Sequence, residues 1–225
     1  MNPPFFGSKI IEDIKVDEVF NLIDRKALFY GRWQLNQEAD PILERLKIKC
    51  VSESILELKI VYGYFKCRRD GNLLFVDGDR CFKFDFPRER TSPNRCVADF
   101  FSDGFIPIQL VTVGSRVAEI GAKLFKQNSY VDAFYLKGLA AESAEALAKY
   151  CHNLIRKDLG VDENQGERFS PGYPVFPDLF DQRKIMSLLK GNRIGVKLTE
   201  TCELVPEYST SAIISVDPKA TYFRP

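Results

Sequence analysis

The spacing of apolar residues changes along the chain from a helical repeat to alternation and then back again. Residues 17–28 carry apolar side chains three or four positions apart, which predicts a helix that Asp17 could cap. A second helix is expected to start at Pro41, because proline fits the first turn of a helix. The first part of the chain is therefore predicted to be helical.

Alternation marks the next part of the chain. Residues 54–65, 73–76 and 82–86 are rich in residues that favour strands, and a tight turn is predicted at residues 77–80. In the last of these strands, three phenylalanines alternate with a lysine and an aspartate. This pattern gives one apolar and one polar face, as is typical of an antiparallel sheet.

One more strand and two more helices are predicted in the middle of the chain. Residues 105–113 form the strand, but Pro107 interrupts it, so we expect an edge strand or a bulge there. Helical spacing returns at residues 115–125 and again, over a longer stretch, at residues 131–158. Gly160 is placed to end that long helix.

The C-terminal part mixes turns, a helix and strands. Residues 166–178 are rich in proline and glycine, residues 182–189 predict a short helix, and residues 195–204 and 211–216 predict strands. Strands and helices occur in blocks and do not alternate strictly. We therefore predict an α+β fold, with a mainly antiparallel twisted sheet and helices, in one domain over residues 1–225.

Composition and charge exclude several classes of protein. The chain has 225 residues, of which 45% are hydrophobic and 28% charged, and its formal net charge is +1. This composition is that of a globular domain, and the charge does not suggest a nucleic-acid binder. No apolar run reaches the ~20 residues needed to cross a membrane, and the N-terminus does not resemble a signal peptide. We therefore expect a cytoplasmic protein with neither nucleic acid nor a membrane as its partner.

The cysteines and the single histidine offer no evident metal site. No two of the six cysteines form a C-x-x-C pair, so most are expected to be buried thiols: Cys50, Cys67, Cys81, Cys96, Cys151 and Cys202. His152 is the only histidine, and its position within the long predicted helix favours packing or solvent exposure over catalysis. The sequence also lacks the glycine-rich motifs of phosphate-binding and dinucleotide-binding loops. Nucleophilic catalysis is not supported.

Residues 168–178 are the most informative segment. They read Arg-Phe-Ser-Pro-Gly-Tyr-Pro-Val-Phe-Pro-Asp, and the three prolines restrict the backbone around Arg168 and Tyr173. A fixed arginine suits the bidentate capture of a carboxylate, and a tyrosine offers a flat surface to a base or a cation. From these residues alone, a proline-rich connection with a solvated Arg168 is the simpler interpretation.

The same segment resembles the S-adenosylmethionine-binding signature of the activation domain of cobalamin-dependent methionine synthase. Its Arg-x-x-Pro-Gly-Tyr motif, continued by Pro-x-x-Pro-Asp, carries most of this resemblance. Weaker similarities follow in the order of that family over nearly the whole chain, at residues 5–7, 23–35, 61–65, 97–100, 139–152, 195–200 and 222–223. The resemblance implies the fold of that activation domain.

The resemblance also implies a set of ligand-binding residues. In that family an N-terminal aspartate and the loop arginine hold the amino acid end of the ligand, and Asp24 and Arg168 occupy those positions here. An ammonium group requires an anion and a carboxylate requires a cation, which agrees with these two charges. Ser170 and Tyr173 match positions where the loop contacts the ligand. A helix or turn cap is the alternative role for Asp24.

Three further residues match family positions near the ligand. Tyr222 and Phe223 correspond to its C-terminal aromatic contact, where a ring could stabilise a sulfonium by cation–π attraction. Packing on the sheet is the alternative for Tyr222. Glu145 matches a helix glutamate near the ligand, and a solvated helix face is the alternative there.

The chain departs from the family pattern at three places. Arg25 follows Asp24 where the family has tryptophan, and residues 161–167 replace a longer acidic excursion. Ala141 stands where the family has an acidic residue, although Glu142 is adjacent. These departures bear on the partner surface more than on the ligand pocket.

The function implied by the resemblance is the reactivation of methionine synthase. S-adenosylmethionine supplies a methyl group and a flavodoxin or ferredoxin supplies one electron, and together they return inactive cob(II)alamin to methylcobalamin. Residues around His152 do not match a corrinoid-binding motif, so the cobalamin is expected on a partner methionine synthase subunit. The chain is then a stand-alone accessory subunit without a self-contained active site.

Two alternatives remain open from the sequence. The chain could be a regulatory subunit that binds S-adenosylmethionine, or it could activate another corrinoid methyltransferase. A metal of its own is not expected in any of these cases.

Overall fold

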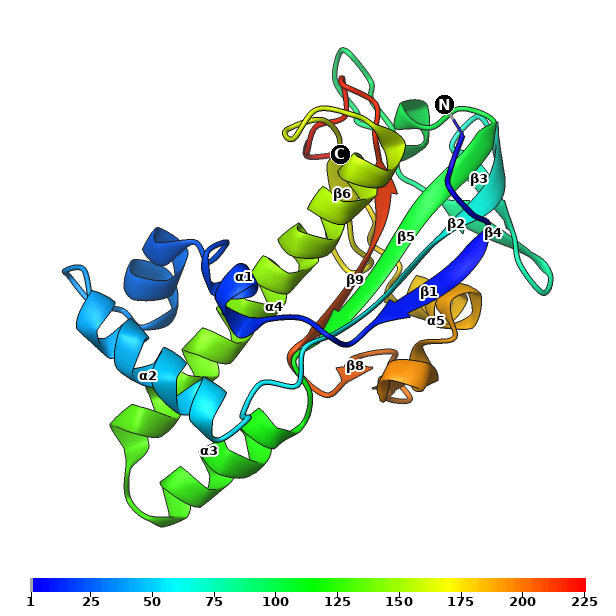
Figure 1. Ribbon diagram of the computed structural model, residues 1–225. Coiled ribbons are helices and arrows are strands. Elements are labelled where there is room, and N and C mark those ends of the chain that lie inside the picture. The colour runs from blue at the N-terminus through cyan, green and yellow to red at the C-terminus, as the bar shows by residue number, and fades with distance from the viewer. Residues whose placement is uncertain (1) are drawn as a thin grey trace.

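A seven-stranded antiparallel sheet forms the centre of the computed structural model, which describes residues 2–225 (Figure 1). The main strands follow the order β4-β3-β2-β5-β9-β6, and β1 pairs with the other half of the β2 edge. Their bounds are β1 Gly7–Ile11, β2 Lys59–Asp70, β3 Leu73–Asp77, β4 Cys81–Asp85, β5 Gly104–Thr112, β6 Glu167–Phe169 and β9 Ser209–Ser215. The predicted α+β class and antiparallel sheet are confirmed.

Alternation along the strands divides the apolar side chains between two cores. In β2, Tyr62 and Tyr64 belong to one core, whereas Val61 and Phe65 belong to the other. Successive side chains of a strand point to opposite faces, so each face of the sheet is covered by its own layer. The two tyrosine hydroxyls also donate hydrogen bonds to Asp158, at 3.0 and 3.1 Å, and thereby tie the sheet to the long helix.

Helices cover one face of the sheet and extend beyond it (Figure 1). These are α1 Val16–Phe20, the π-helix η1 Ala27–Arg32, α2 Asp40–Ser52, α3 Arg116–Lys126 and α4 Tyr130–Leu159. The long helix α4 contacts β5 and β9 with one part and the other helices with the rest. Gly160 ends α4 in the left-handed conformation, with a φ of 66°, as the sequence predicts.

The helix predicted over residues 17–28 is wrong as a single element. It is divided into α1 and η1, because a turn separates Phe20 from Ala27. The carboxylate of Asp24 accepts a hydrogen bond from the Ala27 N–H at 3.0 Å and so begins the second helix. A polar side chain that satisfies a free amide group in this way favours a new helix start over continuation.

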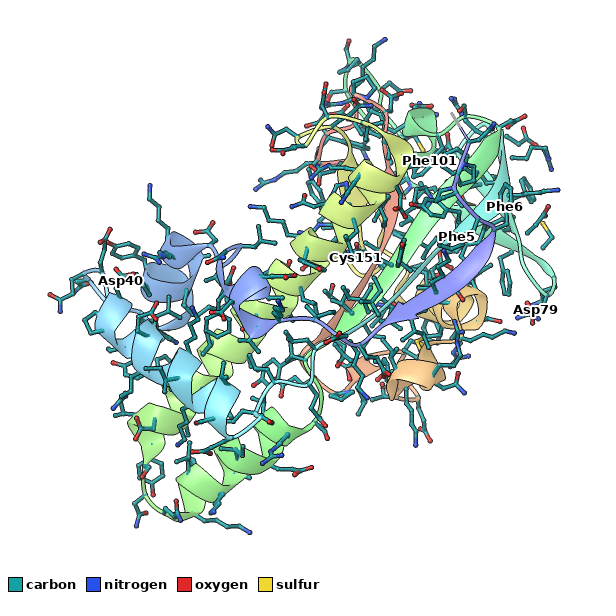
Figure 2. All side chains as sticks on the ribbon, viewed as in Figure 1. Phe5, Phe6, Asp40, Asp79, Phe101 and Cys151 are labelled. Atoms are coloured by element: carbon teal, nitrogen blue, oxygen red, sulfur yellow. The ribbon has the colours of Figure 1, made fainter. Side chains whose placement is uncertain are left out.

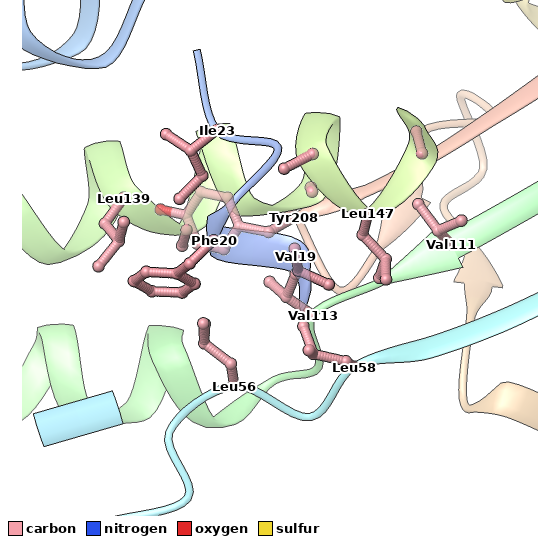
Figure 3. Packing of buried hydrophobic residues seen from close by; sticks show 14 of the residues in the cluster. Val19, Phe20, Ile23, Leu56, Leu58, Val111, Val113, Leu139, Leu147 and Tyr208 are labelled. Atoms are coloured by element: carbon pink, nitrogen blue, oxygen red, sulfur yellow. The ribbon is translucent and has the colours of Figure 1, made fainter. Parts of the chain in front are cut away.

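The first core lies between α4, the N-terminal helices and the sheet. Figure 3 shows Phe20 and Ile23 near Leu139 of α4 and Val19 near Val113, and all of these residues belong to this core. Trp33 donates its indole N–H to the Tyr135 carbonyl at 2.9 Å, which fixes η1 against α4. Burial of these large side chains is the main stabilising term, at about 25 cal/mol for each Å² of apolar surface.

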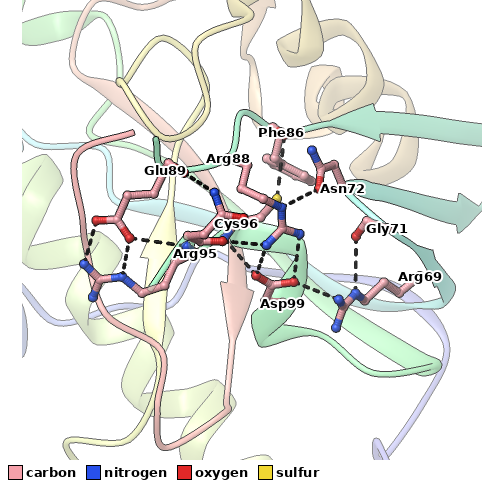
Figure 4. A network of polar contacts seen from close by, with 10 residues as sticks. Arg69, Gly71, Asn72, Phe86, Arg88, Glu89, Arg95, Cys96 and Asp99 are labelled. Carbon is pink, nitrogen blue, oxygen red and sulfur yellow. Dashed lines mark hydrogen bonds and ion pairs between the residues drawn. The ribbon is translucent and has the colours of Figure 1, made fainter. Parts of the chain in front are cut away.

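The second core lies on the opposite face, under α5 Gln182–Leu189 and three short 3-10 helices, η2 Val97–Phe100, η3 Leu179–Asp181 and η4 Gly191–Ile194. A polar network closes one end of this layer (Figure 4). Asp99 accepts hydrogen bonds from Arg88 and Arg69 at 2.7 Å each. Burial acts to raise the pKa of Asp99, but the two guanidinium groups hold it below its usual range.

Several predicted strands differ from the structure. Pro107 was expected at an edge or a bulge, but β5 lies inside the sheet between β2 and β9. The ladder with β9 begins one residue later, at Ile108, so the proline without an N–H lies just beyond that ladder. Residues 195–204 contain only β7 Lys197–Leu198 and the start of β8 Leu204–Val205, which pair separately from the main sheet. Strands β1 and β6 were not predicted.

Five of the six cysteines are buried free thiols, in agreement with the expectation for most of them, and Cys81 alone is exposed. Cys151 lies on α4 where the helix passes over the sheet (Figure 2). Within residues 2–225, no helix combines the length and the apolar character that a bilayer crossing demands.

The close approach of β1 to β2 provides a test of the fold. A Cβ atom on Gly63 would lie 2.1 Å from the carbonyl oxygen of Gly7, so Gly63→Ala must push two paired strands apart. We expect it to lower the free energy of unfolding by about 1–3 kcal/mol in urea denaturation. Gly31→Ala is the matched control, because no heavy atom lies within 4 Å of its Cβ position. Equal stability of the two variants would contradict the strand pairing.

Candidate functional site

The sheet edge places Arg168 opposite the long helix. Arg168 lies in β6, directly across from Ile214 of β9, and Ile214 belongs to the core beneath α4. Paired residues of neighbouring strands share a face, so the arginine also points to the α4 side. Its neighbour Phe169 is fully buried on the other face and anchors the strand.

Arg168 forms an ion pair with Glu145 of α4. The guanidinium Nη2 lies 3.6 Å from the Glu145 Oε2, and the two side chains are 28% and 43% exposed. Among the described residues, no side-chain atom of Arg168 makes a hydrogen bond within the protein. A loose pair of this kind leaves most of the donors of the guanidinium free for a ligand.

The loop after β6 is a tight turn held by the second core. Gly172 donates its N–H to the Phe176 carbonyl, and Phe176 donates to the Tyr173 carbonyl, both at 2.8 Å. Gly172 has a φ of 91°, which favours glycine. Val175 and Phe176 are fully buried, whereas Tyr173 is 56% exposed. The loop therefore presents Tyr173 to solvent from a rigid support.

These groups meet at a small cavity. It has a volume of about 140 Å³, and its walls include five of the predicted ligand residues together with Gln109: Glu145, Arg168, Ser170, Tyr173 and Tyr222. Burial, and next the nearby Tyr173, raise the pKa of the Tyr222 hydroxyl. The sequence-based grouping of these five residues thus corresponds to one place in the structure.

A wider cleft of about 760 Å³ shares part of this wall. Glu145, Ser170, Tyr173 and Thr210 line both spaces, and residues in and around β8 also line the wider cleft, including Glu203 and Glu207. The dimensions suit a small organic ligand. The acidic residues of the far wall were not predicted, because only the folded chain brings residues 203–207 opposite the proline-rich loop.

Asp24 lies outside the walls of both spaces and is exposed. Its hydrogen bond to Ala27 is the cap interaction that the sequence left open as an alternative role. Asp24 is still close enough to α4 to affect Glu142 of that helix. Burial raises the pKa of Glu142, and the negative charges of Glu145 and Asp24 raise it further, whereas Arg32 lowers it. A role for Asp24 in ligand binding stays a prediction.

Phe223 also lies away from the cavity walls. Its side chain is 4% exposed and belongs to the second core, where the Arg95 guanidinium lies 5.1 Å from the ring centroid. The adjacent Tyr222 is exposed and does line the small cavity. Phe223 thus anchors the C-terminal segment that carries Tyr222, and its direct contact with a ligand stays a prediction.

His152 lies beneath the site and is only 4% exposed. Burial lowers its pKa to about 3, and the positive charges of Arg156 and Arg168 act in the same direction. Packing, one of the two roles left open by the sequence, is therefore the observed one. Within residues 2–225, no three side chains of histidine, cysteine, aspartate or glutamate are grouped so as to hold a metal ion.

A family model described as "Vitamin B12 dependent methionine synthase, activation domain" matches residues 15–224. The chain belongs to this family. The predicted family assignment is therefore confirmed.

Individual proteins agree with this activation-domain assignment. The chain is 32% identical over 273 aligned positions to the methionine synthases of Mycobacterium tuberculosis and of Mycobacterium leprae. The alignment covers 99% of the chain but only 23% of each relative, so the chain spans about a quarter of their length. A crystal structure of the MetH reactivation domain bound to AdoHcy matches the fold with a TM-score of 0.85. That match covers 100% of this chain and 83% of the other, at 24% identity.

The buried histidine predicts how the stability of this activation domain depends on pH. The pKa of His152 in the folded state is about 3, below its ordinary 6.5, so only the unfolded chain binds the proton between these values. The contribution of neutral, buried His152 to stability is complete above pH 6.5 and is lost as the pH falls toward 3. Between pH 7 and pH 5 we expect His152 to reduce the free energy of unfolding by about 2 kcal/mol.

Urea denaturation at the two pH values measures this change, with His152→Gln as the comparison. The variant should lose less stability than the natural protein, because its side chain does not titrate. Parallel losses in both proteins would show that His152 is protonated in the folded state.

Proposed function

We propose that this chain binds S-adenosylmethionine between β6, the following loop and α4, and presents its methyl group to the reduced cobalamin of a methionine synthase. Membership of the activation-domain family supports this proposal, and so does the fold shared with a reactivation domain that binds AdoHcy. The observation that carries it is the open ion pair between Arg168 and Glu145 at the wall of a cavity with two tyrosines.

A zwitterion fits between two opposite charges. The carboxylate of the ligand pairs with Arg168, and its ammonium group lies on the side of Glu145 and Asp24. Arg168 and Glu145 are partners 3.6 Å apart in the structure. On binding, the ligand carboxylate replaces Glu145 as the partner of Arg168, and the ligand ammonium replaces Arg168 as the partner of Glu145. Each protein charge therefore keeps a partner of opposite sign. An arginine whose donors are free can also donate hydrogen bonds to both carboxylate oxygens at once.

The remaining residues orient the rest of the ligand. Tyr173 and Tyr222 place ring surfaces beside the sulfonium, whose positive charge is attracted to the face of an aromatic ring. Ser170 contributes its backbone at the narrow end that the two spaces share. Phe223 supports Tyr222 from the second core. The adenosine part extends into the wider cleft, toward Glu203 and Glu207.

The mechanism that follows is one of positioning. Reduced cobalamin on the partner accepts the methyl group of the sulfonium by direct displacement, and AdoHcy remains as the product. The chain holds the ligand at its amino acid end and its rings, and it keeps the methyl group directed outward. Such a transfer requires no general acid or base, and correct orientation supplies the rate enhancement.

The partners implied by this proposal are a cobalamin-binding methionine synthase region and an electron donor such as flavodoxin or ferredoxin. The relatives carry the matched region as part of a longer protein, which supports a cobalamin-bearing partner. Residues 1–225 act here as one activation domain that contributes the methyl donor.

Substitution of the arginine tests the ligand site. Arg168→Ala should weaken the binding of S-adenosylmethionine by about ten- to a hundredfold in isothermal titration calorimetry, because one charge-assisted hydrogen-bonded pair is lost. Arg45→Ala is the matched control, since it removes an exposed arginine paired with Asp132 at 3.1 Å on another part of the chain. Unchanged affinity in Arg168→Ala would reject the assignment.

A reactivation assay distinguishes methyl presentation from regulation. The full chain is mixed with a methionine synthase fragment that carries cob(II)alamin and lacks an activation domain, in the presence of S-adenosylmethionine and a chemical reductant. We expect methylation of the cobalamin, followed by its absorption spectrum, and a slower rate with Arg168→Ala at subsaturating ligand. Ligand binding without any methylation would favour a regulatory protein.

A further inference from the structure

One buried side chain at the candidate site has no partner for its acceptor atom. Gln109 lies in the middle of β5, between Tyr62 of β2 and Ala212 of β9, and its side chain is fully buried. Its Nε2 donates a hydrogen bond to the Ala148 carbonyl of α4 at 3.2 Å. Its Oε1 has no hydrogen-bond partner among the described residues.

The hydrogen bond to α4 determines which end of the amide remains free. A carbonyl oxygen accepts hydrogen bonds only, so the NH₂ group of Gln109 must face Ala148. The opposite orientation would place two acceptors against each other. The free atom is therefore an acceptor, and leaving a buried acceptor unsatisfied is unfavourable.

The residue that carries this free acceptor is one of those that line the small cavity. Gln109 lines the same 140 Å³ as Glu145, Arg168 and Tyr222. The cavity wall carries donors of its own, such as Arg168 and Tyr222, but none of them donates to Oε1 in the structure, so a molecule in the cavity can supply the matching group. A carboxylate cannot serve, because it has no proton to donate at neutral pH.

We infer that Gln109 binds the α-ammonium group of the ligand, with its Oε1 as a neutral acceptor at the base of the cavity. This inference rests on the proposed binding of S-adenosylmethionine. With the ligand carboxylate on Arg168, the ammonium group lies on the same cavity wall, beside Glu145 and over Gln109. An ammonium group has three donors, so Gln109 can take one while carboxylates take the others.

Gln109 gives the largely apolar strand β5 a role in specificity. An uncharged acceptor inside the sheet selects for a donor and does not attract cations in general, whereas Glu145 on the rim does. A ligand without the amino group would leave Oε1 buried and unpaired, and buried polar groups without partners are what allow a site to reject close analogues. Gln109 is thus expected to distinguish an amino acid ligand from a ligand that lacks the amine.

The test compares two ligands and three proteins by calorimetry. The ligands are AdoHcy and its analogue in which hydrogen replaces the α-amino group. The proteins are the natural chain, Gln109→Met, and the control Gln165→Met. Gln165 also donates its side-chain amide to a backbone carbonyl, that of Val216 at 2.6 Å, but it does not line the cavity. Thermal unfolding confirms that each variant is folded.

We expect Gln109→Met to weaken the binding of AdoHcy by about tenfold and to leave the affinity for the analogue unchanged. Gln165→Met should change neither affinity. Equal weakening of both ligands by Gln109→Met would show a structural role and overturn the inference. Unchanged AdoHcy affinity would overturn it as well. If the natural chain binds neither ligand, the proposed function fails and the inference fails with it.

Discussion

The packing of α4 against β5 and β9 is the constraint on which the candidate site depends. The helix contributes Glu145 to the cavity wall and His152 to the layer below, and the sheet contributes Gln109 and Arg168. Because the helix crosses the strands, residues far apart in the sequence meet at one end of the contact. A shift of α4 along the sheet would separate the ion pair and open the cavity at the same time.

The charged residues of the site lie around this contact, and within residues 2–225 the positive charge at the cavity comes from a single residue. Arg168 is the positive group at the cavity, and it affects the buried layer as well, where its charge helps to keep His152 neutral. Glu142 and Glu145 lie one turn apart on α4, with Asp24 on the neighbouring helix start. Arg168 on the sheet edge thus faces Glu145 on the helix, and a zwitterionic ligand requires one positive and one negative group in this way.

The sequence predicted the proline-stiffened loop and its exposed Tyr173 well, because the local chain determines them, but it did not predict that Arg168 lies in the strand β6. The prolines restrict the backbone wherever the loop is placed, and Gly172 permits the positive φ that the turn requires. Val175 and Phe176 are apolar enough to be buried in any fold. It predicted Phe223 less well. Tyr222 and Phe223 are adjacent aromatic residues, and local sequence does not show which of them is buried. Packing in the second core buries Phe223 and leaves Tyr222 exposed.

Apolar periodicity by itself determined the strands β2 to β5, the helices α2 to α5 and the antiparallel character of the sheet, because it depends on neighbours in sequence. The Arg-x-x-Pro-Gly-Tyr motif, by resemblance, determined the family. Only the tertiary structure decided that β5 lies inside the sheet, that β6 forms its edge, and that Gln109 lines a cavity and has an unpaired acceptor. These features depend on which strand and helix lie beside each residue, and such long-range pairing is set by the packing of the whole chain.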